Sequence, residues 1–167
     1  KAQNSKIDLK EKEYVLCSCG RLSKEKGFDL AVQSAKILKD RGVSFYWYIV
    51  GDGAERVMLE QMIKKCGLED NMEITGMKDN PYQFISGCNI YVQPSYEEAM
   101  PVTIIEVHRL NKPVITTATV GGNKLVENGK NGIVCEISSD ALAESITDLT
   151  ANKELYNNII SNLETTD

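Results

Sequence analysis

The sequence predicts a single doubly wound α/β domain over residues 1–167, with a Rossmann-like parallel sheet and helices on both faces. Short apolar runs alternate with amphipathic stretches, and the apolar runs lack the polar alternation of half-exposed strands. The connections between them are short, so right-handed crossovers and a parallel sheet follow. A chain of 167 residues with 42% hydrophobic content is long enough to form one core.

The first half of the chain shows this alternation most clearly. A strand is predicted at Tyr14–Cys19, and apolar residues at helical spacing follow between Phe28 and Leu38, with Gly42 placed to close that helix. The next apolar run, Phe45–Val50, ends in the turn at 51–53. A helical stripe over 58–66 is closed by Gly67.

The second half continues the pattern with shorter elements. The predicted strands are residues 72–75, 90–93, 113–116 and 133–136, and the predicted helices are 81–86, 101–110, 140–150 and 153–163.

Composition excludes several classes of protein. The net charge of −5 and the lack of a basic stripe argue against nucleic-acid binding. The five cysteines are odd in number and lie mostly in apolar runs, which predicts reduced core thiols and a cytoplasmic protein. A metal site is not expected, because there is no C-x-x-C pair and the only histidine, His108, is adjacent to no cysteine.

The two ends of the sequence indicate a fragment of a longer chain. No run approaches the about 20 apolar residues that cross a bilayer, and the polar start lacks a signal core. That start also lacks Met, and the end follows an apolar-periodic segment without an obvious cap.

The stretch SYEEAMPVTIIE, residues 95–106, gathers carboxylates around a predicted helix start. Pro101 suits the first helical position, which would leave the amides of Val102 and Thr103 free to bind a phosphate. Glu106 would lie about 5.4 Å further along the same face. Glu98, in the preceding loop, could grip a sugar hydroxyl from the other side of that phosphate. Alternatively, these acids only favour the helix dipole.

Arg21 and Lys26, in the loop after the first strand, could supply the cations of a diphosphate site. The alternative is a solvated, charged loop. The Gly51-Asp52-Gly53 turn is a weak signal, because it could be a tight strand-to-helix turn with Asp52 as the cap. It is not a Walker loop, since no Gly-Lys-Ser/Thr follows.

Together these residues resemble the C-terminal, donor-binding half of retaining glycosyltransferases with the GT-B fold, the family 4 group. The resemblance covers residues 15–149, and its most specific element is the E-x7-E pattern of Glu98 and Glu106. The other matching segments are Gln93-Pro94-Ser95, Gly20-Arg21-Leu22, Lys26-Gly27, Gly51-Asp52-Gly53, Gly76 and Lys112-Pro113-Val114-Ile115.

The resemblance implies a role for each of these site residues. Arg21 and Lys26 would bind the diphosphate of a UDP- or GDP-sugar, Glu106 the ribose, and Glu98 the transferred sugar, as the catalytic residue. The loop of Ala99, Met100, Pro101, Val102 and Thr103 would surround the donor, whose base would lie against the backbone near Gly76 and Met77. Gly51 would also bind the donor. No metal cofactor would be required.

Some positions depart from the family pattern. Ala99-Met100 replaces the usual Gly-Phe, and Asn111 replaces a glycine, although Asn also adopts the left-handed conformation. The loop after Gly122 is one residue shorter than usual and lacks an acid. His108 is expected to pack or to be exposed, rather than to act in catalysis.

The family builds its acceptor site on an N-terminal domain that this sequence lacks. The fragment is therefore expected to bind donor without transferring sugar to the glycan or lipid-linked acceptor, and the parent protein could contact the membrane peripherally. Two alternatives stay open: a nucleotide-sugar 2-epimerase-like domain, and a non-catalytic, receiver-like binding module. A receiver would need acids at the end of the first strand, where Gly20-Arg21 stands.

Overall fold

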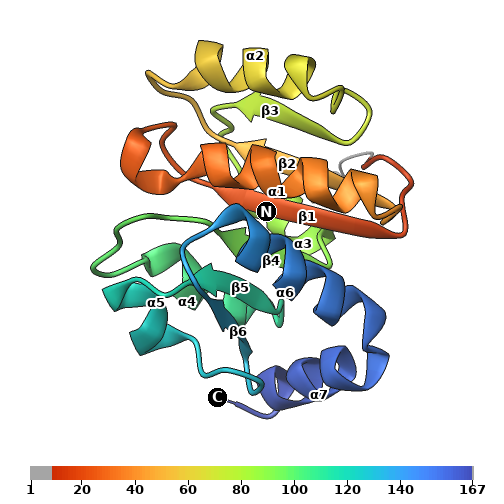
Figure 1. Ribbon diagram of the computed structural model, residues 1–167. Coiled ribbons are helices and arrows are strands. Elements are labelled where there is room, and N and C mark those ends of the chain that lie inside the picture. The colour runs from red at the N-terminus through yellow and green to blue at the C-terminus, as the bar shows by residue number, and fades with distance from the viewer. Residues whose placement is uncertain (1–8, 167) are drawn as a thin grey trace.

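A six-stranded parallel sheet forms the centre of the molecule, in the strand order β3-β2-β1-β4-β5-β6. The computed structural model describes residues 9–166 (Figure 1). The strands are β1 (Tyr14–Cys19), β2 (Phe45–Val50), β3 (Met72–Gly76), β4 (Ile90–Gln93), β5 (Val114–Thr117) and β6 (Gly132–Cys135). The predicted fold class is confirmed.

Helices cover both faces of this sheet. They are α1 (Phe28–Asp40), α2 (Arg56–Lys65), α3 (Tyr82–Gly87), α4 (Val102–Arg109), α5 (Val120–Leu125), α6 (Ser139–Ala151) and α7 (Lys153–Glu164), with a short 3₁₀ turn, η1 (Lys24–Lys26). Apolar residues of α1, α2, α6 and α7 form one core. Those of α3, α4 and the end of α5 join the other core, on the opposite face.

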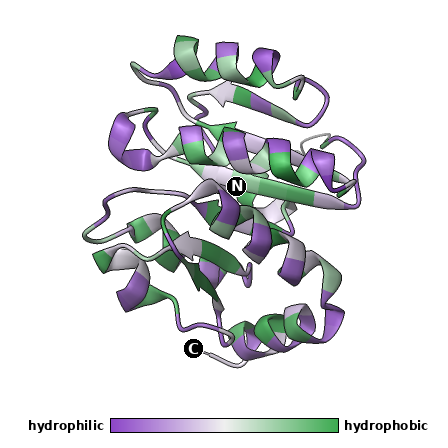
Figure 2. Ribbon diagram, viewed as in Figure 1, coloured by the Kyte–Doolittle hydropathy of each residue, from purple (hydrophilic) through white to green (hydrophobic). Residues whose placement is uncertain are grey.

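The strands divide their side chains between these two cores. Leu16 and Trp47 pack with α1 and α6, whereas Val15 and Cys17 point to the other face. Because successive side chains of a strand point to opposite faces, both faces of β1 and β2 must be apolar. In Figure 2, β1 is white to green, whereas the helices alternate between green and purple.

The strand order creates a crevice between β1 and β4. From β1 the chain runs outward to β2 and β3, and it then returns to pair β4 with the other side of β1. The helices that follow β1 and β4 lie on opposite faces, so the loops after these strands separate at the carboxyl edge. Ligands of open α/β sheets bind at such a switch point.

Most predicted elements are confirmed, and three strands, Tyr14–Cys19, Phe45–Val50 and Ile90–Gln93, have the predicted bounds. Neither η1 nor α5 was predicted. Helix α5 has six residues and contains Gly121 and Gly122, which are poor helix formers. Its start is stabilised by Thr119, whose hydroxyl accepts a hydrogen bond from the Gly122 amide. Among the described residues, no helix is long and apolar enough to cross a membrane.

Candidate functional site

Two adjoining cavities lie at the carboxyl edge of the sheet, and they share Cys19, Gly20, Arg21 and Thr103. The larger, of about 690 Å³, extends over the ends of β2 and β3. The smaller, of about 430 Å³, extends over the end of β4 to the start of α4. Because they share one wall, the two cavities form a continuous trough across the switch point.

An ion pair between Lys26 and Glu98 lies in the smaller cavity. The Lys26 ammonium donates to both carboxylate oxygens of Glu98 at 2.9 Å. The two side chains are 25% and 13% exposed, so the pair is partly shielded from water. An ammonium group has three N–H donors, and this arrangement uses two of them. The third can reach another anion in the cavity.

The backbone brings these two residues together. Gly27 has φ 67°, and a Cβ there would lie 2.0 Å from the carbonyl oxygen of Pro94, so only glycine allows this approach. The Tyr96 amide donates to the Glu25 carbonyl at 2.8 Å. The loops after β1 and β4 are therefore joined directly on both sides of Lys26.

Two buried polar side chains lie behind Glu98. The Ser95 hydroxyl donates to Glu98 Oε2 at 3.3 Å and accepts from Gln93 Nε2 at 3.0 Å. Ser95 is fully buried and Gln93 is 5% exposed. Sequence reasoning noted both only as part of a motif. Their link to Glu98 depends on how the loop after β4 folds back.

The start of α4 differs from the prediction in two ways. The helix begins at Val102, and Pro101 is its N-cap, with ψ 84° outside the helical region. In that tight turn the Val102 amide donates to the Met100 carbonyl at 2.9 Å, so this amide is not free. The Thr103 amide has no hydrogen-bond partner among the described residues. Thr103 also lines both cavities, so it is the amide available to an anion.

Glu106 lies about one turn further along α4, next to Tyr82. Its carboxylate raises the pKa of the Tyr82 hydroxyl, so the two side chains are close. Glu106 is not among the described residues that line the two cavities. The first turn of α4, which is described in full, holds no acidic residue. Glu98 and Glu106 therefore are not placed where they would favour the α4 dipole most.

The larger cavity is lined by turns after β2 and β3. Gly51 and Met77 are in its wall, and Met77 is 82% exposed. Gly76 lies just behind them, where its carbonyl accepts from the Gly51 amide at 3.1 Å. Asp52 is not the cap of α2, because Glu55 holds that position. Instead the Gly53 amide and the Arg56 guanidinium lower the pKa of Asp52, which orders the turn.

Arg21 stands at the junction of the two cavities. Its side chain is exposed and forms no ion pair with any residue of the described chain. A planar guanidinium in such a position can bind two oxygens of a phosphate at once. Lys26 forms an ion pair with Glu98, whereas within residues 9–166 the Arg21 guanidinium keeps all its donors for a ligand.

The loop that carries Ala99 and Met100 rests on α5. The Gly121 amide donates to the Glu98 carbonyl at 2.7 Å, and a Cβ at Gly121 would clash with Pro101 and Ala99. Ala99 and Met100 are both exposed, and neither lines the two described cavities. The shortened segment after Gly122 thus begins as a helix that supports Glu98 from behind.

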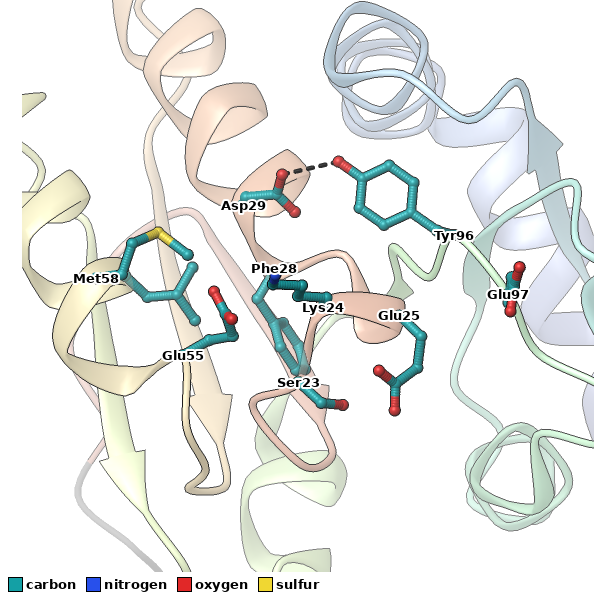
Figure 3. A pocket seen from close by; sticks show the side chains of 10 residues that line it. Ser23, Lys24, Glu25, Phe28, Asp29, Glu55, Met58, Tyr96 and Glu97 are labelled. Carbon is teal, nitrogen blue, oxygen red and sulfur yellow. Dashed lines mark hydrogen bonds between the residues drawn. The ribbon is translucent and has the colours of Figure 1, made fainter.

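A third cavity, of about 590 Å³, lies beside the trough and is lined by Glu25, Phe28, Glu55, Tyr96 and their neighbours. In Figure 3 the Tyr96 hydroxyl points at Asp29, to which it donates at 2.7 Å. Burial, together with Asp29, raises the pKa of Tyr96 to about 12. This contact anchors the loop before Glu98 to the first turn of α1.

The remaining predicted features lie outside the trough. His108 is half-buried on α4 against the Asn131 carbonyl, and burial lowers its pKa. Asn111 has φ 57°, so it adopts the left-handed conformation expected after α4. All five cysteines are free thiols, of which Cys17 and Cys88 are buried. Within residues 9–166, no cluster of three or more His, Cys, Asp or Glu side chains could hold a metal ion.

The strand order and the trough at its switch point define a Rossmann-like domain of the kind found in GT-B glycosyltransferases. The sequence pattern of the family described as glycosyl transferases group 1 matches residues 1–166. The chain belongs to this family.

Individual relatives agree with that assignment. The alpha-D-kanosaminyltransferase of Streptomyces kanamyceticus is 32% identical over 146 residues, which cover 86% of this chain and 38% of the relative. The lipopolysaccharide core biosynthesis glycosyltransferase LpsE of Rhizobium meliloti is 26% identical, with 90% and 44% covered. The chain thus spans less than half the length of these two curated relatives.

Among solved structures, the Anabaena protein HepE in complex with UDP-glucose superposes with a TM-score of 0.83. It is 25% identical, and the superposition covers 90% of this chain and 43% of HepE.

Proposed function

We propose that this domain binds the nucleotide-diphosphate-sugar donor of a retaining glycosyltransferase, which transfers a hexose to a glycan or lipid-linked acceptor. The observation that carries the proposal is the Lys26–Glu98 pair at the switch point, next to Arg21 and the free Thr103 amide. Lys26 can bind Glu98 with two N–H groups and a phosphate with the third, while Glu98 can accept from a hydroxyl group. This arrangement suits a ligand that carries a phosphate next to a sugar.

The residues divide along the trough by their chemistry. Arg21, the third N–H of Lys26 and the Thr103 amide bind the diphosphate and stabilise the charge that develops on it as the sugar departs. Glu98 accepts a hydrogen bond from a sugar hydroxyl. The nucleoside lies over Gly51, Gly76 and Met77. Glu106, which contacts Tyr82 outside the two cavity linings, binds the ribose diol from the next turn of α4. The two cations replace a metal ion in this scheme.

HepE supports this choice of ligand, because its structure was solved with UDP-glucose and its fold covers 90% of this chain. UDP-sugars are thus the first donors to test, and GDP-sugars the second. The named relatives also include an enzyme of lipopolysaccharide core biosynthesis, which favours a role in polysaccharide assembly.

A second domain would face this trough. Large apolar side chains are exposed along the carboxyl edge of the sheet, in the segments that follow β3, β4, β5 and β6. They are Met77, Met100, Val102, Val120 and Ile137. Such a surface suits a cleft closed by an acceptor-binding domain. The isolated chain therefore binds donor without appreciable transfer, whereas the longer protein transfers with retention.

The longer protein works in the cytoplasm, in keeping with the free thiols of this chain. It contacts the membrane of its acceptor peripherally.

Calorimetric titration of the chain with UDP, GDP, ADP and CMP tests donor binding. One nucleoside diphosphate should bind, and its nucleoside should bind much more weakly. Glu106→Gln should weaken the diphosphate by on the order of 1–3 kcal/mol through the lost charge-assisted hydrogen bonds. Glu98→Gln should spare it and weaken only the sugar conjugate.

The exposed neighbour Glu97 provides the matched control, since Glu97→Gln removes the same charge one residue away. It should change neither affinity. A folded chain that binds none of the four nucleotides would exclude the proposal. NMR of the product anomers formed by the longer protein tests retention, and an inverted product would contradict it.

A further inference from the structure

Glu98 is held from behind by a relay of hydrogen bonds that reaches the core of the sheet. Gln93 Nε2 donates to Ser95 Oγ at 3.0 Å, and Ser95 Oγ donates to Glu98 Oε2 at 3.3 Å. Ser95 is fully buried, so water does not compete for its hydroxyl. It is not among the described residues that line the cavity, so it acts on a ligand only through Glu98.

Gln93 fixes the direction of this relay. A hydroxyl has one proton to donate and lone pairs to accept with, whereas an amide N–H can only donate. Since Gln93 occupies a lone pair of Ser95 Oγ, the single proton of Ser95 is left for Glu98. Ser95 Oγ is therefore the hydrogen-bond donor to the Glu98 carboxylate.

The neighbouring strand fixes the position of the relay. The Thr117 hydroxyl, at the end of β5, lies against the carbonyl oxygens of both Ser95 and Gln93. Thr117 is itself fully buried. The backbone that carries the serine is thus held to the sheet and not only to its own loop.

The other partner of Glu98 is held less tightly. Lys26 is 25% exposed, ends a flexible stem, and has the diphosphate as a competing anion under the proposed function. Because its third N–H binds that anion, Lys26 is drawn towards it and its bonds to Glu98 weaken, whereas Oε2 keeps the hydrogen bond from Ser95.

We propose that Ser95 is a positioning residue, which holds Oε2 of Glu98 so that Oε1 faces a hydroxyl of the donor sugar. This inference rests on the proposed function, because it assigns Glu98 to the sugar. It makes Ser95 a determinant of affinity for the nucleotide-sugar and not for the nucleotide.

A double-mutant cycle on the whole chain tests the proposal, with UDP and UDP-glucose as probes, or GDP and GDP-mannose if the guanine nucleotide is the one that binds. Ser95→Ala should lower affinity for the sugar conjugate about tenfold, the effect of one hydrogen bond to a charged group, and leave the nucleoside diphosphate unchanged. In the Glu98→Gln background, Ser95→Ala should have little further effect, because the two residues act as one unit.

Ser34→Ala is the matched control. Ser34 is also fully buried, but its hydroxyl donates to the Ala31 carbonyl within α1. This variant should change the affinity for neither probe, although it also removes a buried hydroxyl. If Ser95→Ala does not fold, Ser95→Cys keeps a similar volume with a weaker donor, and it should lower the affinity for the sugar conjugate in the same direction.

The possible outcomes separate the two proposals. Losses that are equal for nucleotide and nucleotide-sugar, or that add fully to those of Glu98→Gln, would overturn the relay while donor binding stands. A wild-type chain that binds neither pair of probes would overturn the proposed function, and the relay with it.

Discussion

The two halves of the trough are held in different ways. In the phosphate and sugar half, Glu98 is 13% exposed and receives hydrogen bonds from Lys26 and Ser95. In the nucleoside half, Lys78 is exposed and Met77 is 82% exposed, and Arg21, at the junction of the two halves, is exposed as well. One half is assembled by contacts within the chain, and the other presents side chains to solvent.

Because of this difference, substitutions in the two halves should affect folding stability and ligand affinity differently. Buried polar groups must have their partners in the folded chain, so substitutions in the first half change stability as well as affinity. Exposed side chains become ordered only as they bind, so substitutions in the second half change affinity alone. The predictions below test that separation.

The largest effect is expected from Gly27→Ala, which disrupts the contact between the loops after β1 and β4. A Cβ at this position would lie 2.0 Å from the Pro94 carbonyl oxygen, and φ is 67°. Left-handed backbone alone costs a non-glycine residue about 1–2 kcal/mol, and the clash adds to it. We expect a loss of about 3 kcal/mol or more in the free energy of unfolding, measured by urea denaturation.

Gly129→Ala separates backbone strain from the clash. Gly129 has φ 82°, but its Cβ would meet nothing within 4 Å. Its loss of stability should be only about 1–2 kcal/mol. Equal losses in the two variants would mean that the approach of Gly27 to Pro94 does not hold the first half together.

Arg21→Ala should give the next largest effect, on affinity alone. Because Arg21 forms no ion pair with the described chain, the urea midpoint should stay unchanged. Loss of its hydrogen bonds to a diphosphate should weaken the nucleoside diphosphate by about 2 kcal/mol, or roughly 30-fold. Arg41→Ala, at an exposed arginine paired with Glu144 on α6, is the control and should not change affinity. A large loss of stability in Arg21→Ala would contradict the claim that exposed site residues affect affinity alone.

The centre of the sheet could be predicted from sequence because β1, β2 and β4 are buried on both faces. Tyr14–Cys19 and Phe45–Val50 are continuous apolar runs with glycine near their carboxyl ends, and their bounds were predicted correctly. Helix α5 could not be predicted, because its glycines look like a turn. Gly121 is required where α5 packs against Ala99 and Pro101, and Gly122 is required where α5 packs against Thr116 and Thr117 at the end of β5. Both are contacts between separate segments.

The sequence predicted that the candidate residues share one edge of the sheet, but it did not predict their contacts. Arg21, Lys26 and Glu98 do meet in one region, as expected from strand ends that share an edge. The Lys26–Glu98 pair joins residues 72 positions apart through the strand order, and no local pattern encodes it. Likewise, the general preference for proline at the first helical position gave the wrong start for α4, because Pro101 lies in a tight turn.

The smallest effect is expected from pH, and it should fall outside both halves of the trough. Burial lowers the pKa of His108, which contacts the Asn131 carbonyl in a cavity with Arg109, Glu127 and Lys130. Its folded pKa is therefore below the unfolded value near 6.5, and the unfolded chain binds the proton more readily. The contribution of neutral His108 is complete above that value and declines as the pH falls through 6.5 towards the folded pKa. Urea midpoints at pH 7.5, 6.5 and 5.5 should fall less in His108→Gln than in wild type, while nucleotide affinity at pH 7.5 stays the same in both. An equal fall in both proteins would show that His108 does not cause it, and altered affinity would place His108 in contact with the site.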